Sequence, residues 1–229
     1  MSDKNHCKKD RKVCIAWFVY YICDRLVLNK INMQKGETTR ELIITTSAEL
    51  FNTKGYNGSS MSDIMEATGL KKGGIYNHFK NKDEIAYAAF DRSYSLVLKR
   101  FKDKLALCET SQEKLRAIIE VFQSLLIDPI VKGGCPIFNT AVDAVDVHPK
   151  LQQRAQDSVN TLLKYVEIKV EEGKIENEFK TTVDASEFAL LLVSSMEGAI
   201  MVSRVNGNHH ALKSTAAMMN NYITTQLLK

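Results

Sequence analysis

The sequence predicts an all-α protein in which a small N-terminal domain of three helices, containing a helix-turn-helix unit, precedes a larger helical domain. The chain has only 3 prolines and 11 glycines among 229 residues, which leaves little room for a turn-rich all-β fold. From about residue 38 onward, apolar residues recur at helical spacing, and strong helix formers fill the stretches between them. Glycine and proline break this pattern into segments of helical length, and no strand is predicted.

Residues 1–35 are expected to be a basic and apolar extension outside both domains. They carry eight basic and three acidic residues, whereas the rest of the chain carries 23 and 24, so the net charge of +4 does not identify a partner. Residues 13–23 are apolar or aromatic without interruption, too short a run for a bilayer, which needs roughly 20. Three interpretations remain: an upstream extension with the functional start at Met33, which we favour, a basic arm that assists DNA or surface binding, or a membrane-associating segment.

The first helix of the N-terminal domain is expected between Thr38 and Lys54. Thr38 and Glu41 have the spacing of a capping box, in which each side chain satisfies a free backbone N–H group. Gly55 supplies the left-handed C-cap.

Two short helices and a long one follow. Ser60 with Asp63 opens the second helix, Gly69 lies in the turn, and the third helix covers about 72–79. Asn81 caps a fourth helix that continues toward residue 107. The two short helices joined at Gly69 form the helix-turn-helix unit.

In such a unit the second helix lies in the major groove, with its N-terminal residues nearest the bases. Between Ala67 and Lys82 the sequence has four lysines and no acidic residue. We expect phosphate contacts from Tyr76, His78 and the lysine pairs on both sides of the helix, because positive charge and hydrogen-bond donors suit the DNA backbone. Glycines at 73 and 74 fit a close approach of backbone to DNA, or a frayed helix start. The candidates for base readout are Lys71, Lys72, Gly74 and Asn77.

Residues 55–64 (GYNGSSMSDI) and 68–84 (TGLKKGGIYNHFKNKDE) resemble the N-terminal domain of the TetR, or tetracycline-repressor, family. The resemblance covers about residues 37–97 and implies a DNA-binding domain at 36–97 and a helical ligand-binding and dimerisation domain at 98–229. His78 is open between a phosphate contact and packing. The positions that the resemblance implies as DNA contacts are Ser60, Lys72, Gly73, Tyr76, His78 and Lys82.

The C-terminal helices are expected at 111–128, 137–146, 148–172, 184–206 and 209–228. The helix at 184–206 is apolar on most faces and must therefore be buried on most faces, against its own core and against a second copy of the chain. The resemblance implies that it forms a four-helix dimer interface with 209–228. DNA recognition also favours a homodimer, because two-fold symmetry reads both halves of a palindromic operator.

The resemblance further implies a small-molecule effector among these helices, and the near-neutral, apolar interior favours a hydrophobic or amphipathic one. Effector binding is expected to move the fourth helix, which joins both domains, and to change the spacing of the recognition helices. Cys135 is either a redox or electrophile sensor or a buried, inert thiol. The candidate pocket residues are Phe101, Leu105, Phe122, Leu126, Cys135, Phe138, Asn139, Val142, Tyr165, Met196 and Met201.

Other classes of protein are weakly supported. The five cysteines contain no Cys-x-x-Cys pair, so the sequence predicts no metal site and no disulfide framework. Cys135 and His148 could be drawn as nucleophile and base, but no catalytic motif surrounds them, and neither an enzyme nor a cofactor is expected. A purely protein-binding helical adaptor would not need an acid-free face around the short helix. We therefore expect a cytoplasmic transcriptional regulator, for which the family's common mode is repression, with no membrane attachment.

Overall fold

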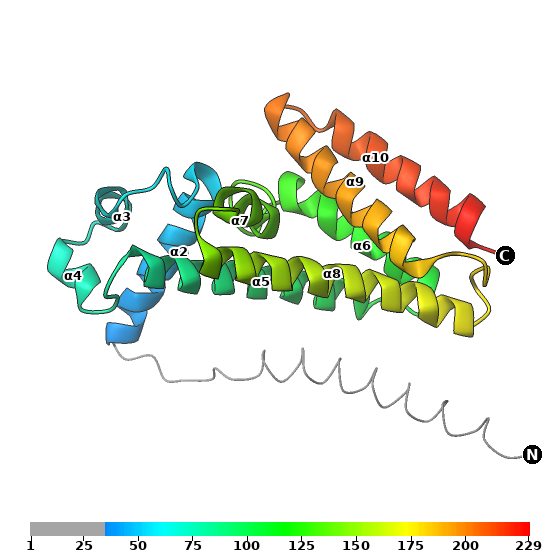
Figure 1. The fold of residues 1–229 in the computed structure, drawn as a ribbon, viewed down its shortest axis with the longest axis horizontal. Coiled ribbons are helices and arrows are strands. Elements are labelled where there is room, and N and C mark those ends of the chain that lie inside the picture. Colours follow the sequence, from blue (N-terminus) through cyan, green and yellow to red (C-terminus); the bar gives the residue numbers. More distant parts are fainter. Residues whose placement is uncertain (1–34) are drawn as a thin grey trace, which may run out of the picture. The chain divides into compact units, whose positions relative to one another are not determined.

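The computed structural model describes residues 35–229, and side chains from residue 38 onward. The extension at 1–34, with its three interpretations, lies outside the described residues. Within them the fold is all-α, as predicted, and contains no strand apart from an isolated bridge between Phe179 and Leu228 (Figure 1).

The region predicted to bind DNA contains α2 (Lys35–Lys54), α3 (Met61–Thr68) and the five-residue α4 (Lys72–Tyr76). These short helices are held together by an isoleucine-rich core that also includes the first turn of the long helix α5 (Lys82–Leu105). Its buried members are Ile43, Ile44, Ile64, Ile75, Phe79 and Ile85. Burial of these side chains contributes the stability that short helices cannot supply alone.

The helix ends follow the predicted chemistry in most places. The hydroxyl of Ser60 accepts from the backbone N–H of Asp63 in a complete capping box, and Gly69 ends α3 with φ +69°. Asn81 caps α5 by accepting from the N–H of Glu84. The start of α2 differs from the prediction: the helix begins at Lys35, so Thr38 is not its N-cap. The third helix also ends earlier than expected, at Tyr76.

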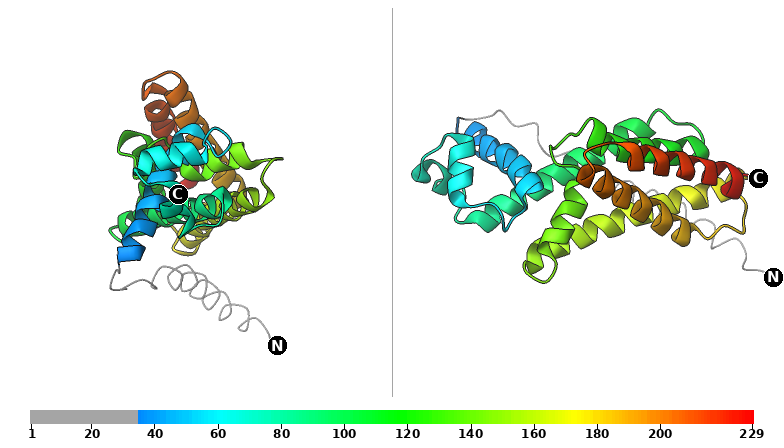
Figure 2. Two further views of the ribbon diagram at one scale, coloured as in Figure 1. Left: turned by 90° about the vertical axis from the view of Figure 1, so that its left-hand side faces the viewer. Right: turned by 90° about the horizontal axis from the view of Figure 1, so that it is seen from above.

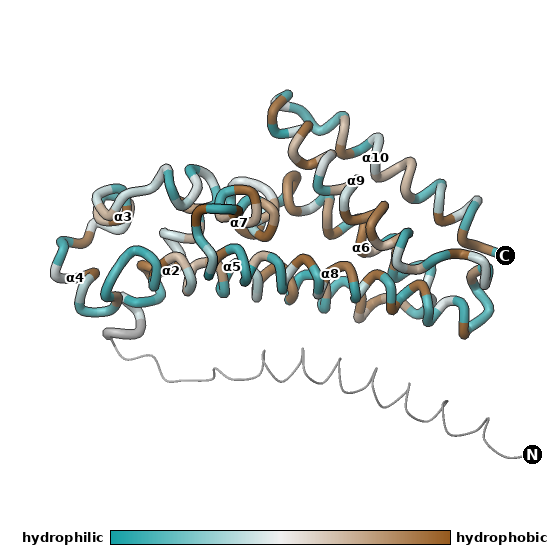
Figure 3. The backbone as a smooth tube through the Cα atoms, in the orientation of Figure 1, coloured by the Kyte–Doolittle hydropathy of each residue, from teal (hydrophilic) through white to brown (hydrophobic). Residues whose placement is uncertain are grey.

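Five helices follow α5, close to the predicted ranges: α6 (Ser111–Ile127), α7 (Pro136–Ala144), α8 (Pro149–Ile175), α9 (Ala185–Val205) and α10 (His210–Tyr222), which continues into a π-helical turn, Ile223–Leu227. Helix α9 packs against α8 and α10, while α6 contacts α5, α8 and α10 (Figure 2). These helices enclose the larger core of the chain, and Figure 3 shows hydrophobic stretches along α6 and α7.

One face of α9 remains apolar and exposed. By length and composition alone, helix α9 could cross a membrane, but half of its apolar stretch is buried inside the protein. The core helix of a soluble protein can have the same length and composition. The exposed apolar residues on α9 and α10 are Leu190, Leu191, Met201, Val202, Val205, Met218 and Tyr222, here called the outer α9–α10 face.

Candidate nucleic-acid interface

Helix α4 is anchored through one side and exposed on the other. Ile75 is completely buried in the small core, and Phe79, just after the helix, is almost so. Lys71, the N-cap residue, makes no side-chain capping bond. The predicted recognition residues Lys71, Lys72, Gly73, Tyr76 and Asn77 are exposed, while Gly74 is half-buried. The fold therefore presents the start of α4 to solvent as the helix-turn-helix prediction requires.

The surface of α4 is basic and partly preorganised. The ammonium group of Lys72 lies 5.6 Å from the centre of the Tyr76 ring, within the range of a cation–π contact. A Cβ atom added to Gly73 would meet no other atom within 4 Å, so nothing within the described chain requires a glycine there. A Cβ on Gly74 would make only ordinary contacts with Leu70.

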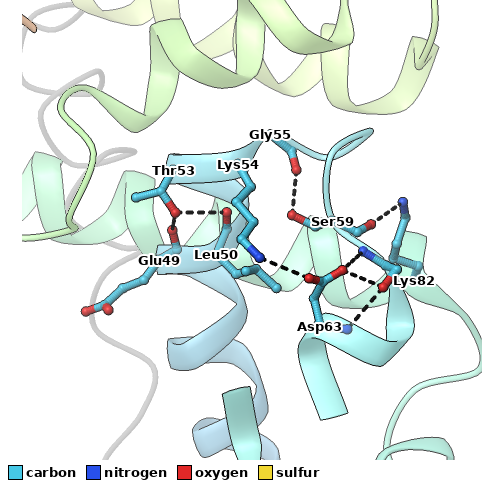
Figure 4. A network of polar contacts seen from close by, with 9 residues as sticks. Glu49, Leu50, Thr53, Lys54, Gly55, Ser59, Asp63 and Lys82 are labelled. Atoms are coloured by element: carbon cyan, nitrogen blue, oxygen red, sulfur yellow. Dashed lines mark hydrogen bonds and ion pairs between the residues drawn. The ribbon is translucent and has the colours of Figure 1, made fainter. Parts of the chain in front are cut away.

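Ser60 lies at the exposed start of α3, where its side chain is engaged in the capping box. Its hydroxyl also donates to the carboxylate of Asp63, which in turn accepts from Lys54 Nζ at 3.0 Å (Figure 4). These hydrogen bonds, those from Ser60 first, hold the pKa of Asp63 well below its usual range. The ionised Asp63 thus joins the end of α2 to the start of α3.

Lys82 has a structural position that the sequence did not reveal. Its ammonium group donates to the backbone carbonyl oxygens of Tyr56 and Ser59, both at 2.9 Å, and lies 3.9 Å from the centre of the Tyr56 ring. Figure 4 shows it reaching the loop that joins α2 to α3. Lys82 therefore fixes this loop against the start of α5.

His78 is half-buried beside α4, so the choice between phosphate contact and packing remains open for its imidazole. A second histidine, His148, was not predicted to act near this domain. Its ring lies edge-on to Tyr56 at 4.7 Å, and its Nε2 atom is 3.6 Å from Asp83 Oδ1. The hydroxyl of Tyr56 donates to the same carboxylate, and burial, followed by this bond, raises the pKa of Tyr56. No sequence pattern links residues 56, 83 and 148, because they come together only through tertiary packing.

The candidate pocket residues fall into three groups. Phe101, Leu105, Phe122, Cys135 and Met196 are buried in the larger core, and the half-buried Leu126, Phe138 and Tyr165 pack against it. Burial raises the pKa of Tyr165 to about 12. Asn139 faces α2 instead, through bonds to Asn52. Met201 and Val142 are 62% and 79% exposed, so neither lines the interior.

A small cleft lies at a different place from the predicted pocket. Its volume is about 30 Å³, room for about two water molecules. It opens between α2, α5, α7 and the start of α8, and of the predicted pocket residues only Asn139 lines it.

Cys135 lies beside a buried carboxyl group, that of Glu197 on α9. Burial raises the pKa of the Cys135 thiol well above its usual value, which favours the inert thiol over a reactive one. Burial also raises the pKa of Glu197 to about 7, and its Oε1 atom has no hydrogen-bond partner among the described residues. Residues 35–229 contain no group of three potential metal ligands.

The arrangement defines a class of protein: a helix-turn-helix DNA-binding domain joined to a helical domain with its own core. Comparison with known proteins identifies the family. The model for "Bacterial regulatory proteins, tetR family" matches residues 43–89, and that for "Tetracyclin repressor-like, C-terminal domain" matches 111–219. The chain belongs to the TetR family of transcriptional regulators, as the resemblance implied, and not to a family of enzymes.

Two solved structures and a curated relative are similar to this chain. A TetR regulator from Chloroflexus aurantiacus J-10-FL is 39% identical, with a TM-score of 0.83 over 86% of this chain and 99% of that one. A TetR-family regulator from Cytophaga hutchinsonii is 31% identical, with a TM-score of 0.78 over 87% of this chain and all of that one. The regulator TtgR of Pseudomonas putida is 23% identical over 174 residues, which are 73% of this chain and 80% of TtgR.

Proposed function

We propose that this chain is a cytoplasmic, homodimeric repressor that binds a palindromic operator and is released from it by a small-molecule effector. We assign DNA binding to residues 36–97, and effector binding and dimerisation to 98–229. The observation that carries the proposal is α4: a helix anchored by Ile75 that exposes Lys71 and Lys72 at its start, in a stretch of four lysines without an acidic residue.

The exposed side chains suggest how contacts divide between bases and phosphates. Lys71, Lys72 and Asn77 can reach base edges from the groove side of α4, and Gly74 can let the backbone approach closely. The contacts proposed for phosphates come from Ser60, Gly73, Tyr76, His78 and Lys82. To contact a phosphate, the ammonium group of Lys82 must donate to it either in addition to the carbonyl oxygens of Tyr56 and Ser59 or in place of one of them.

The outer α9–α10 face supports dimerisation. The opposite side of α9 is buried in the larger core. Gly198 on α9 has no side chain, and a Cβ added there would meet no atom within 4 Å. A second copy packed on this face in a four-helix arrangement would bury these apolar residues. Binding to a palindrome requires that this dimer hold its two recognition helices about 34 Å apart, the spacing of successive major grooves.

A hydrophobic or amphipathic effector suits the interior around Phe101, Phe122 and Met196. Phe122 and Met196 are completely buried, so binding of an effector against them would require neighbouring side chains to move. Helix α5 contributes Ile85 to the small core and Phe101 to the larger one, so such a movement can reach the DNA-binding domain. Regulators of this fold have been solved with choline and with stearoyl-CoA, and the relative DhaR is named a repressor.

The decisive experiment is selection of bound sequences from random duplex DNA, with wild type beside the Lys72→Ala/Tyr76→Phe variant. We expect wild type to enrich a palindrome and the variant to enrich none. Chains beginning at Met1 and at Met33 should both be used, because residues 1–32 are the part of the chain with three open interpretations. Absence of any enriched sequence at low salt for both chains would contradict the proposal, as would binding that does not depend on salt.

A further inference from the structure

A buried asparagine near the end of α2 joins the DNA-binding domain to the C-terminal helices. Asn52 is 7% exposed, and its side-chain amide donates to the carbonyl oxygens of Lys132 at 3.0 Å and Gly134 at 3.1 Å. Both acceptors belong to the loop that precedes α7. The last turn of α2 is therefore bonded to a segment far along the sequence.

Asn139 on α7 completes this contact from the other side. Its Nδ2 group donates to the Asn52 side-chain oxygen at 2.8 Å, to the Asn52 backbone oxygen at 3.2 Å and to the Gly133 carbonyl at 2.8 Å. The backbone oxygen of Asn52 is one of the last four carbonyls of α2, which a helix cannot satisfy internally. Asn139 thus acts as an external cap for α2.

The same asparagine is held by α9. Arg204 Nη1 donates to Asn139 Oδ1 at 2.9 Å, which uses the acceptor side of an amide whose donor side serves α2. A continuous path of hydrogen bonds therefore runs from α9 through Asn139 to Asn52. We name Asn52, Gly133, Gly134, Asn139 and Arg204 the Asn139 junction.

Backbone geometry shows that the loop is closely fitted between the two helices. Gly133 has φ +114°, and a Cβ there would lie 2.6 Å from the Asn52 carbonyl oxygen. Gly134 has φ +88°, and a Cβ there would lie 3.1 Å from Arg204 Cδ and 3.5 Å from Ile200 Cγ2. Any other residue would be strained at both positions, and at Gly133 the added Cβ would also force the loop and α2 apart.

Arg204 lies on the same helix, α9, as Met201 and Val205, which belong to the outer α9–α10 face. We propose that Asn139 and Arg204 are positioning residues for DNA binding, which hold the last turn of α2 to α9 so that the position of α9 in the dimer sets the position of the DNA-binding domain. The DNA-binding part of this inference rests on the proposed function, whereas the connection of α9 to α2 through the Asn139 junction does not.

The test compares Arg204→Ala with Arg116→Ala, a matched control. Arg116 also donates to an asparagine side chain, Asn220 Oδ1 at 3.0 Å, but between α6 and α10. Arg204 is exposed, so its truncation leaves the cores intact. Hydrogen exchange on the DNA-free protein reports on the amides of residues 48–55. We expect Arg204→Ala to speed their exchange by about tenfold and Arg116→Ala to leave it unchanged.

The second readout is affinity for the operator obtained by selection. We expect Arg204→Ala to weaken operator binding by about tenfold, within the usual range of coupling between distant sites. Arg204→Lys, which keeps a donor on a long side chain, should stay within about threefold of wild type. Because both residues act along one path, Arg204→Ala/Asn139→Ala should bind no more weakly than Asn139→Ala alone.

The two readouts separate failure of this inference from failure of the proposed function. If the wild-type chain binds no DNA but Arg204→Ala still speeds amide exchange in residues 48–55, the repressor proposal is wrong, while the connection of α9 to α2 is supported. If wild type binds its operator and Arg204→Ala changes neither exchange nor affinity, the inference is overturned. Faster exchange confined to α9 would overturn it equally, as would a Lys variant as weak as the Ala variant.

Discussion

The two domains of this chain differ in where their distinctive residues lie: at the surface in the DNA-binding domain and in the interior in the C-terminal domain. In the DNA-binding domain, most of the residues proposed to make contacts are exposed, on or beside short helices that a core of six large side chains holds in place. In the C-terminal domain, the distinctive groups are interior ones: Phe122, Cys135, Met196 and Glu197. Residues of an exposed site can be substituted without loss of the fold. Residues of an interior site also stabilise the fold, so their substitution changes function and stability together.

The largest effect that this contrast predicts is in the interior of the C-terminal domain. Phe122 is completely buried, with its ring 5.9 Å from that of Phe101 in an edge-on contact. Phe122→Ala should lower the free energy of unfolding by about 4 kcal/mol, through lost burial and the cavity that remains. Urea denaturation measures this, and Leu107→Ala, at a position 81% exposed, is the control. A loss below about 1 kcal/mol would show that this interior is loosely packed already.

The second effect concerns the buried carboxyl group of Glu197 and depends on pH. Its pKa is raised from 4.5 to about 7 in the folded chain, so folding favours the protonated form. The stabilisation of this form is complete below pH 4.5 and is lost as the pH rises through about 7. Relative to Glu197→Gln, wild type should lose about 3 kcal/mol of unfolding free energy across that range, since each pKa unit corresponds to about 1.4 kcal/mol.

The Gln variant serves as its own control, because every other titrating group is common to the two proteins. Urea denaturation of both, at a series of pH values from about 4.5 to about 8 that spans the folded and unfolded pKa, gives the difference directly. If the unfolding free energies of the two proteins changed in parallel with pH, Glu197 would titrate normally. The interior of the C-terminal domain would then tolerate an ionised group.

The contrast also explains which features could be predicted from the sequence. The capping box at Ser60, the turn at Gly69 and the cap at Asn81 depend on neighbours within a few residues, and the structure contains all three. The start of α2 was missed because Thr38 has capping chemistry but the helix continues before it. Lys82, Asn139 and Glu197 acquire their surroundings from segments distant in sequence, and a single sequence does not show those contacts. Met201 was assigned to the interior by its apolar character, which equally suits the exposed face of a helix that we expect to form a dimer.

A third, smaller effect tests the exposed site of the DNA-binding domain. Lys72→Ala should weaken operator binding by about tenfold and lower the salt slope of log affinity by about one, since one phosphate or base contact is lost. The unfolding free energy should change by less than about 0.5 kcal/mol, because Lys72 is exposed. Lys213→Ala, an exposed lysine on α10, provides the comparison and should leave both quantities unchanged. An equal effect of the two lysines would indicate a response to net charge rather than a site on α4.

The smallest effect is also the sharpest test, because two quantities should move in opposite directions at one position. Gly73 lies within α4, and a Cβ there has open space, so Gly73→Ala should raise the unfolding free energy by up to about 1 kcal/mol through better helix propensity. If the glycine is present because α4 approaches DNA closely, the same methyl group should weaken operator binding by about threefold or more. Gly74→Ala, which meets only Leu70 at 3.7 Å, allows a comparison one residue along the helix. Stronger DNA binding by Gly73→Ala would mean that the glycine merely frays the helix, and that the lysines and Asn77 account for recognition without any close approach of the backbone.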